Sequence, residues 1–169
     1  NPTAIAVTRK NAKKNEVNLT AMESDLFAKF PDNEFDVISI HPPAVPYLPT
    51  EGWGLSENMS IATNGGADGS EMVVRTIKEA RRCLKEKGKL LLLLPHWSNT
   101  GRALEALRKD YKSAEELAKQ RIEFFPAAEG KPSREILQHA YALAKQNTIT
   151  LEFDGKKIFS YASVILAIK

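Results

Sequence analysis

The stretch FDVISIHPPAVPY, residues 35–47, decides the fold and raises the question of function. Its first six residues are rich enough in apolar and β-branched side chains to form a buried strand. The prolines that follow cannot continue a strand interior, because proline lacks an N–H group and fixes φ. The chain must therefore leave the sheet at His41, either as a plain strand end or as a rigid elbow that contacts a ligand.

Helix-like and strand-like segments alternate on both sides of this stretch. Apolar residues at helical spacing and β-rich runs bounded by turn residues predict helices over residues 1–17, 70–87, 99–110 and 133–147 and strands over residues 18–24, 35–40 and 89–95. The uninterrupted apolar run KLLLLLP, residues 89–95, is typical of a strand covered on both faces in a parallel sheet.

The C-terminal part predicts two further features. The sequence SAEE at residues 113–116 has the form of a capping box and predicts another helix from Ser113. Asp154 and Gly155 lie between two β-rich runs and indicate a hairpin. The whole pattern predicts an α/β fold, a doubly wound, mostly parallel sheet with a C-terminal antiparallel hairpin, in a single domain over residues 1–169.

Composition and charge exclude several classes of protein. A chain of 169 residues, 43% hydrophobic and 27% charged, suits one soluble domain with a real core. The single cysteine, Cys83, allows no internal disulfide and is expected to be structural, and the three histidines lack metal-ligand spacing. No apolar run approaches the roughly 20 residues that span a membrane. We expect a cytoplasmic protein without a membrane partner or a bound metal.

The basic residues give a weaker signal. The net charge is +3, and most basic residues alternate with acids as on solvated helix faces. The first helix is the exception, since Arg9, Lys10, Lys13 and Lys14 follow one another without acids between them. A nucleic-acid partner therefore stays open as an alternative.

Three groups of residues follow predicted strands, where ligands of α/β folds bind. Asp25 and Leu26 follow the first strand. A carboxylate beside an apolar wall suits a nucleoside, although an ordinary acidic residue in a loop would give the same pattern. His96 and Trp97 follow the third strand, where they either line a pocket or form an exposed pair. The group after the second strand is the elbow. His139 lies within a predicted helix, where a surface or core position is expected.

The elbow itself, His41-Pro42-Pro43-Ala44, follows the second strand. Proline carbonyls have no neighbouring N–H group in competition, so they can point into a cleft. With His41 beside them, they can grip a planar amide or amino group. A rigid strand end without a ligand is the alternative.

The order of these motifs resembles the class I S-adenosylmethionine-dependent methyltransferases, and most of all the HemK-like glutamine methyltransferases and the small methyltransferase domain family. Those proteins have an acid-hydrophobic pair that borders the cofactor adenine, then an Asn-Pro-Pro-Tyr motif, then a Gly-Gly-x-Asp-Gly segment before a helix. The matching positions here are Asp25-Leu26, His41 to Ala44, and Gly65 to Gly69, and the likeness covers roughly residues 1–95.

The resemblance implies a Rossmann-like enzyme that uses S-adenosyl-L-methionine to N-methylate a protein side chain or a small molecule at the elbow. It implies His41 and Pro42 as catalytic residues. Pro43, Ala44 and Tyr47 would join these two in binding the acceptor, and Asp25 and Leu26 would bind the cofactor.

The sequence departs from the family in two places. His41 and Ala44 stand where the family has Asn or Asp and an aromatic residue, so glutamine is not the expected acceptor; Tyr47 or Trp53 are candidates for the lost aromatic surface. The family's glycine-rich cofactor loop and ribose-binding acid do not occur in these 169 residues. We expect the C-terminal portion of a methyltransferase fold whose exposed sheet edge permits oligomerisation. A non-catalytic, methyltransferase-like binding module is the alternative.

Overall fold

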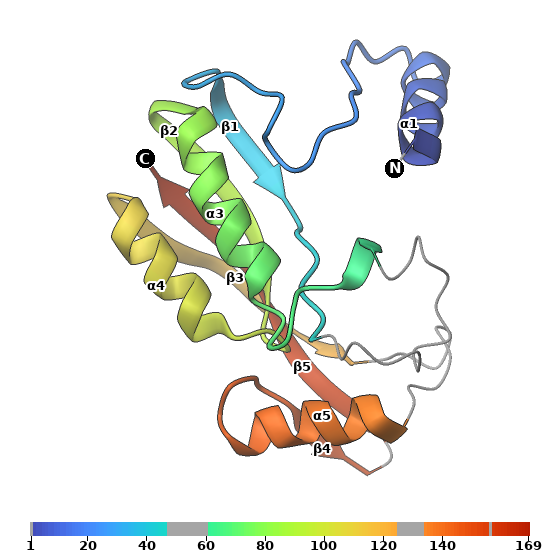
Figure 1. Ribbon diagram of the computed structural model, residues 1–169, viewed down its shortest axis with the longest axis vertical. Coiled ribbons are helices and arrows are strands. Elements are labelled where there is room, and N and C mark those ends of the chain that lie inside the picture. Colours follow the sequence, from blue (N-terminus) through green and yellow to red (C-terminus); the bar gives the residue numbers. More distant parts are fainter. Residues whose placement is uncertain (1, 47–60, 125–133, 156) are drawn as a thin grey trace. The chain divides into compact units, whose positions relative to one another are not determined.

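The computed structural model describes residues 2–46, 61–124, 134–155 and 157–169 (Figure 1). Contacts between residues divide the chain into two compact units, residues 1–30 and 31–169. The single domain over residues 1–169 stays a prediction. In the part of the chain that the structure describes, no helix is both long and apolar enough to cross a membrane.

The first unit contains one helix, α1 (Pro2–Lys14), with Pro2 at the first helical position, where its missing N–H costs nothing. The predicted strand over residues 18–24 is wrong, because this segment is coil. Residues 2–30 provide no other strand, so its backbone N–H and C=O groups have no ladder to join. The guanidinium of Arg9 instead donates to the carbonyl of Ala21 at 2.9 Å and ties the coil to the helix.

The second unit is built around a mixed sheet (Figure 1). Its elements are β1 (Phe35–Ile40), α3 (Glu71–Cys83), β2 (Leu84–Pro95), α4 (Thr100–Asp110), β3 (Ser113–Glu123), α5 (Arg134–Lys145), β4 (Glu152–Asp154) and β5 (Lys157–Ile168). The strand order is β1-β2-β5-β3, with β4 paired to β5.

The α/β class and the C-terminal hairpin are confirmed, but the described sheet is mixed rather than mostly parallel. Only β1 and β2 pair in parallel, and β5 pairs antiparallel with β2, β3 and β4. The cause is that the last strand enters between β2 and β3 and reverses the direction at the centre of the sheet. Two antiparallel steps restore the direction, so β3 runs the same way as β1 and β2.

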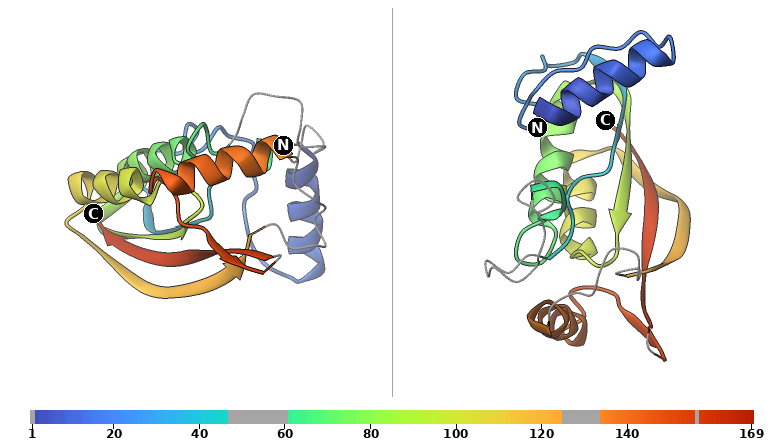
Figure 2. Two further views of the ribbon diagram at one scale, coloured as in Figure 1. Left: turned by 90° about the horizontal axis from the view of Figure 1, so that it is seen from below. Right: turned by 90° about the vertical axis from the view of Figure 1, so that its right-hand side faces the viewer.

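The core lies on the face of the sheet that α3 and α4 cover (Figure 2). Alternate residues of β2 and β5 point to it, and the fully or nearly fully buried members are Leu90, Leu92, Leu94, Ile165 and Ala167. Their neighbours Leu91, Leu93, Val164 and Leu166 point to the opposite face and are half-buried. Tyr111 closes the core at the end of α4, where its hydroxyl donates to the carbonyl of Ile77 at 2.9 Å.

The helix predicted from Ser113 is wrong. Residues 113–123 form β3, which pairs with β5 from Ser113 opposite Ile168 to Glu123 opposite Phe159. The segment SAEELAKQRIE consists mostly of helix-forming residues, but the open edge of β5 offers it a continuous ladder, and that pairing overrides the local preference. The helix predicted over residues 70–87 likewise ends at Cys83, where β2 begins.

Two adjacent leucines test which face carries the core. Leu92→Ala should lower the free energy of unfolding by about 2–5 kcal/mol, because it leaves a cavity under α3 and α4. Leu93→Ala should cost clearly less, since that side chain is already in contact with solvent. Urea unfolding of both variants measures the difference, and equal losses would contradict the assignment of the faces.

Candidate acceptor site

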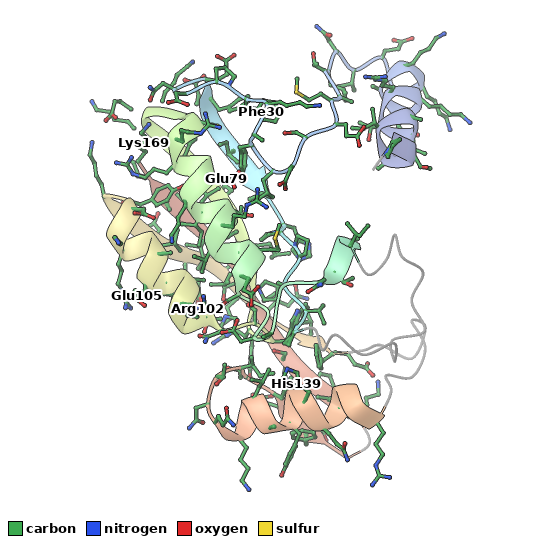
Figure 3. All side chains as sticks on the ribbon, viewed as in Figure 1. Phe30, Glu79, Arg102, Glu105, His139 and Lys169 are labelled. Carbon is green, nitrogen blue, oxygen red and sulfur yellow. The ribbon has the colours of Figure 1, made fainter. Side chains whose placement is uncertain are left out.

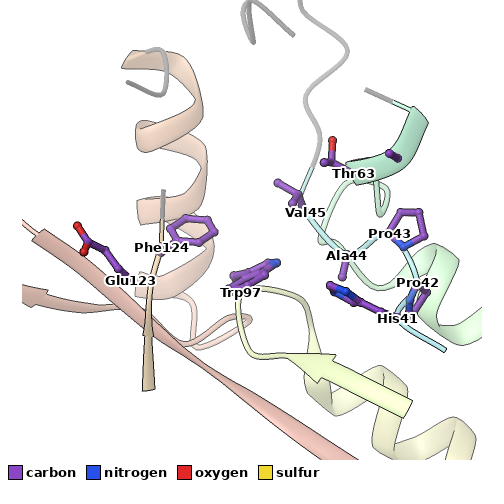
Figure 4. A pocket seen from close by; sticks show the side chains of 10 residues that line it. His41, Pro42, Pro43, Ala44, Val45, Thr63, Trp97, Glu123 and Phe124 are labelled. Atoms are coloured by element: carbon purple, nitrogen blue, oxygen red, sulfur yellow. The ribbon is translucent and has the colours of Figure 1, made fainter. Parts of the chain in front are cut away.

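The elbow forms one wall of a cavity of about 330 Å³. His41, Pro42, Pro43, Ala44 and Val45 line this wall together with Ala62 and Thr63, and the opposite wall consists of Trp97, Glu123 and Phe124 (Figure 4). The sheet explains why these residues meet. β1, β2 and β3 all run in the same direction, so the residues at their carboxyl ends gather at one edge of the sheet.

The elbow is held in place by backbone hydrogen bonds to the segment before α3. The N–H of Val45 donates to the carbonyl of Thr63, and the N–H of Gly65 donates to the carbonyl of Val45, both at 2.9 Å. Pro42 is fully buried. A chain that cannot pair as a strand therefore still has a fixed course past the cavity.

Two glycines bring this segment unusually close to the elbow. A Cβ atom at Gly65 would lie 2.7 Å from the Cα of Ala44, and one at Gly69 would lie 2.5 Å from the carbonyl oxygen of Ala44. Gly69 also has a φ of +77°, which other residues rarely adopt. The Gly-Gly-Ala-Asp-Gly sequence thus serves the close approach of two backbones behind the elbow.

Asp68 anchors the glycine segment to α4. Its carboxylate accepts hydrogen bonds from the N–H and hydroxyl of Ser70 at 3.0 and 2.6 Å, from the amide of Asn99 at 2.9 Å, and from the guanidinium of Arg102 at 3.2 Å. Burial alone would raise the pKa of Asp68, but these hydrogen bonds together outweigh it and lower the pKa below 3.8. The carboxylate is therefore charged and satisfied within the protein.

Trp97 is the central side chain of the opposite wall. Its indole packs on Phe124 with 5.4 Å between ring centroids, and Figure 4 shows it between Phe124 and the elbow, with the nitrogen end toward the elbow. The indole nitrogen is shielded from solvent and has no hydrogen-bond partner among the described residues. A buried donor without an acceptor costs about 1–3 kcal/mol, so the indole would gain a hydrogen bond if it turned this N–H toward a ligand atom.

The charged group of the cavity is already paired. Glu123 lies at the end of β3, and its carboxylate accepts from the ammonium of Lys157 at 3.0 Å. Among the described lining side chains, no other acidic residue is present. Figure 4 shows the imidazole of His41 directed from the elbow toward the cavity.

The other two histidines have structural contacts. His96 Nε2 lies 2.8 Å from the hydroxyl of Ser163, which itself donates to Glu116 at 2.6 Å, so the ring nitrogen must be the donor. Burial lowers the pKa of His96, and nearby Lys119 lowers it further. His139 donates to the carbonyl of Ala67 at 2.9 Å and supports the glycine segment (Figure 3). Of the pair His96 and Trp97, the tryptophan lines the cavity and the histidine does not.

Several predicted site residues are not tested by this geometry. Tyr47 and Trp53 lie outside the described residues. Asp25 and Leu26 belong to the unit 1–30, where Leu26 has a φ of 45° in a turn and the carbonyl of Asp25 accepts from the N–H of Ala28 at 3.0 Å. Cys83 is fully buried, and burial raises the pKa of its thiol. In the described ranges, no three metal-binding side chains gather at one point.

The comparison with known sequences finds an informative relative. No protein-family model matches the chain. A curated protein of Methanocaldococcus jannaschii, named "Putative protein N5-glutamine methyltransferase MJ0928", is 40% identical over 94 residues, which make up 55% of this chain and 46% of that protein. The chain thus spans about half the length of the curated relative it matches.

Solved structures show the same fold at low sequence identity. The YcgJ protein of Bacillus subtilis has a TM-score of 0.62 at 13% identity and covers 98% of this chain and 77% of its own. The "putative methyltransferase (BH2331)" of Bacillus halodurans has a TM-score of 0.53 at 14% identity, with 97% and 76% covered. The architecture is thus that of the Rossmann-like class I methyltransferases, and the resemblance predicted from the motif order is confirmed. Among these matches, the relative found by sequence is the one named as a putative protein N5-glutamine methyltransferase.

The described residues around the cavity fit part of what a methyl acceptor and S-adenosylmethionine would require. The elbow and the opposite wall suit an acceptor, because they combine carbonyls, a histidine and aromatic surface. The neighbouring hollow on the other side of His41 is lined by Ser39, Ile40, Leu91, Leu93 and Val164, which offer no carboxylate for ribose hydroxyls. The described residues of this hollow therefore provide no group that would hold the ribose of S-adenosylmethionine.

Asp68→Asn should destabilise the protein by about 1–3 kcal/mol at pH 7, because it removes the charge that holds Ser70 and Arg102. The lowered pKa means that the carboxylate stabilises the folded state above pH 3.8 and loses this effect as the pH falls through its lower folded-state value. The stability of the variant should accordingly fall less steeply in acid.

Asp36→Asn is the control, since its side chain is 80% exposed and pairs only at the surface with Lys85. Chemical unfolding between pH 2.5 and 7 measures both variants. Parallel pH profiles for Asp68→Asn and the unmodified protein would contradict the anchoring role.

Proposed function

We propose that this chain provides the acceptor-binding half of an S-adenosylmethionine-dependent methyltransferase that methylates a nitrogen atom. The observation that carries the proposal is the cavity between the proline elbow and the Trp97–Phe124 wall, at the carboxyl edge of a methyltransferase-type sheet. S-adenosylmethionine supplies an activated methyl group, so the protein needs to orient and desolvate the acceptor more than to activate it.

The residues of the elbow have distinct roles in this proposal. The carbonyl of Pro42 accepts a hydrogen bond from the N–H of the acceptor and fixes the direction of the nitrogen lone pair. His41 accepts a second hydrogen bond or takes the proton that the nitrogen releases, since a neutral imidazole has one ring nitrogen that accepts. The glycine segment and Asp68 keep both groups in position. Asp25 and Leu26 would border the adenine.

A non-catalytic binding module is the second candidate. Ala44 favours it, because the elbow lacks the aromatic residue that packs on the acceptor in the HemK-like family. The cavity would then hold a ligand without methylating it. Binding of S-adenosylmethionine separates the two candidates.

Titration of the full-length protein with S-adenosylmethionine is the first test. We expect saturable binding and a rise of the melting temperature, since a ligand that binds only the folded state stabilises it. Adenosine monophosphate serves as the control nucleotide. A melting temperature and a calorimetric signal that S-adenosylmethionine leaves unchanged would reject the enzyme and favour the binding module.

Two variants of His41 test the elbow. His41→Ala should reduce methyl transfer by about 10²-fold or more, because it removes a group that orients the acceptor or takes its proton, whereas binding of S-adenosylmethionine should persist. His41→Asn restores the residue type of the family and should retain more activity than His41→Ala. Transfer of labelled methyl to a panel of peptides and amines gives the rates, and full activity of His41→Ala would remove His41 from the site.

A further inference from the structure

We propose that the acceptor is a flat, uncharged heteroaromatic amine and that Trp97 determines this specificity. The inference rests on the proposed function and names the substrate class of the same cavity. Trp97 contributes the surface on which the ring lies and one hydrogen bond from its indole N–H.

The size of the cavity is the first argument. At about 330 Å³ it falls within the range of about 300–1,000 Å³ typical of sites for whole small molecules. The carboxamide end of a glutamine side chain would leave much of this space empty. A ring system with one or two fused rings fills it better.

The position of the aromatic surface also favours a flat ligand. Ala44 gives the elbow no ring, but the opposite wall holds the indole of Trp97 backed by Phe124 at 5.4 Å. Figure 4 shows Trp97 between Phe124 and the elbow residues. Aromatic rings prefer offset-stacked or edge-to-face contacts, so a flat ligand in the cavity would find ring surface on the side of Trp97.

Charge gives the third argument. An alkylammonium acceptor such as a lysine side chain would need a free carboxylate in the cavity. Glu123 is the only acid among the described lining residues, and the ammonium of Lys157 occupies it at 3.0 Å. The walls are otherwise mainly apolar, which favours a ligand without charge.

The hydrogen-bonding groups give the fourth argument. The indole N–H of Trp97 is donor only, is unpaired among the described residues and is shielded from solvent, so an acceptor atom such as a ring nitrogen reaches it only when the indole turns toward the ligand. The proline carbonyls of the elbow are acceptors only, so they require an N–H group. An amino-substituted heteroaromatic ring carries both kinds of group in one plane.

The test uses 3-aminoquinoline, a neutral bicyclic amine, against N-acetylglutamine methylamide and butylamine. The chain has two tryptophans, so the ¹⁵N spectrum of the labelled protein has two indole signals, and Trp97→Phe identifies that of Trp97 by its loss. We expect 3-aminoquinoline to shift the Trp97 signal saturably downfield, and neither of the other compounds to do so. Trp97→Phe should bind 3-aminoquinoline at least tenfold more weakly and bind S-adenosylmethionine unchanged.

The outcomes separate this inference from the proposed function. A Trp97 signal that responds to the glutamine amide or to butylamine instead, or to none of the compounds, overturns the inference while binding of S-adenosylmethionine keeps the proposed function. Loss of S-adenosylmethionine binding in the unmodified protein rejects the proposed function itself. If Trp97→Phe fails to fold, Trp53→Phe gives the same assignment, because the one remaining indole signal then belongs to Trp97. The titration with the three compounds is then carried out on this variant.

Discussion

The close approach of two backbone segments, Ala44 and the glycine segment of residues 65–69, is the constraint on which the site depends. Neither Gly65 nor Gly69 could carry a Cβ without displacing Ala44. The elbow therefore lines the cavity on one side while its other side is packed against main chain. Asp68 extends the constraint to α4, so the position of the elbow is coupled to the helices that cover the core.

The two walls of the cavity differ in the way they are built. The elbow is fixed by main-chain contacts and tolerates few changes of backbone. Trp97 and Phe124 are side chains that follow the ends of two strands, and they contact a small apolar cluster with Ala140 and Ile149. Such a wall can change by substitution without any change of fold. Acceptor specificity in this architecture is therefore expected to vary at the strand ends rather than at the elbow.

Local sequence predicts the parts of the fold where pattern and pairing agree. The strand over residues 35–40, the hairpin at Gly155 and the helix after Ser70 are found where expected, because apolar period and turn residues agree with the tertiary contacts. The strand over residues 113–123 could not be predicted, since its composition is helical and only the edge of β5 makes it a strand. The segment over residues 18–24 is the opposite case. Its sequence is typical of a strand, but the structure describes no strand that pairs with it.

In the candidate site, too, some residues could be predicted from local sequence and others depend on tertiary pairing. The elbow could be predicted from its prolines and from the order of the neighbouring motifs, and Trp97 from its place after an apolar strand. Phe124 could not be predicted, because its position depends on the strand over residues 113–123, whose composition favours a helix. The pairing of Glu123 with Lys157 depends on the register of β3 and β5, which no local pattern specifies.

The position of β5 has a consequence for the order in which the protein is made. β5 is the last strand of the described chain, yet it lies inside the sheet and is the only described link between β2 and β3. While the ribosome synthesises residues 31–156, β2 has an open edge and β3 has no strand to join. The sheet, and with it the wall that Phe124 provides, can close only after residues 157–168 have left the exit tunnel, so nascent chains expose the apolar strand β2 and invite chaperone binding until that moment.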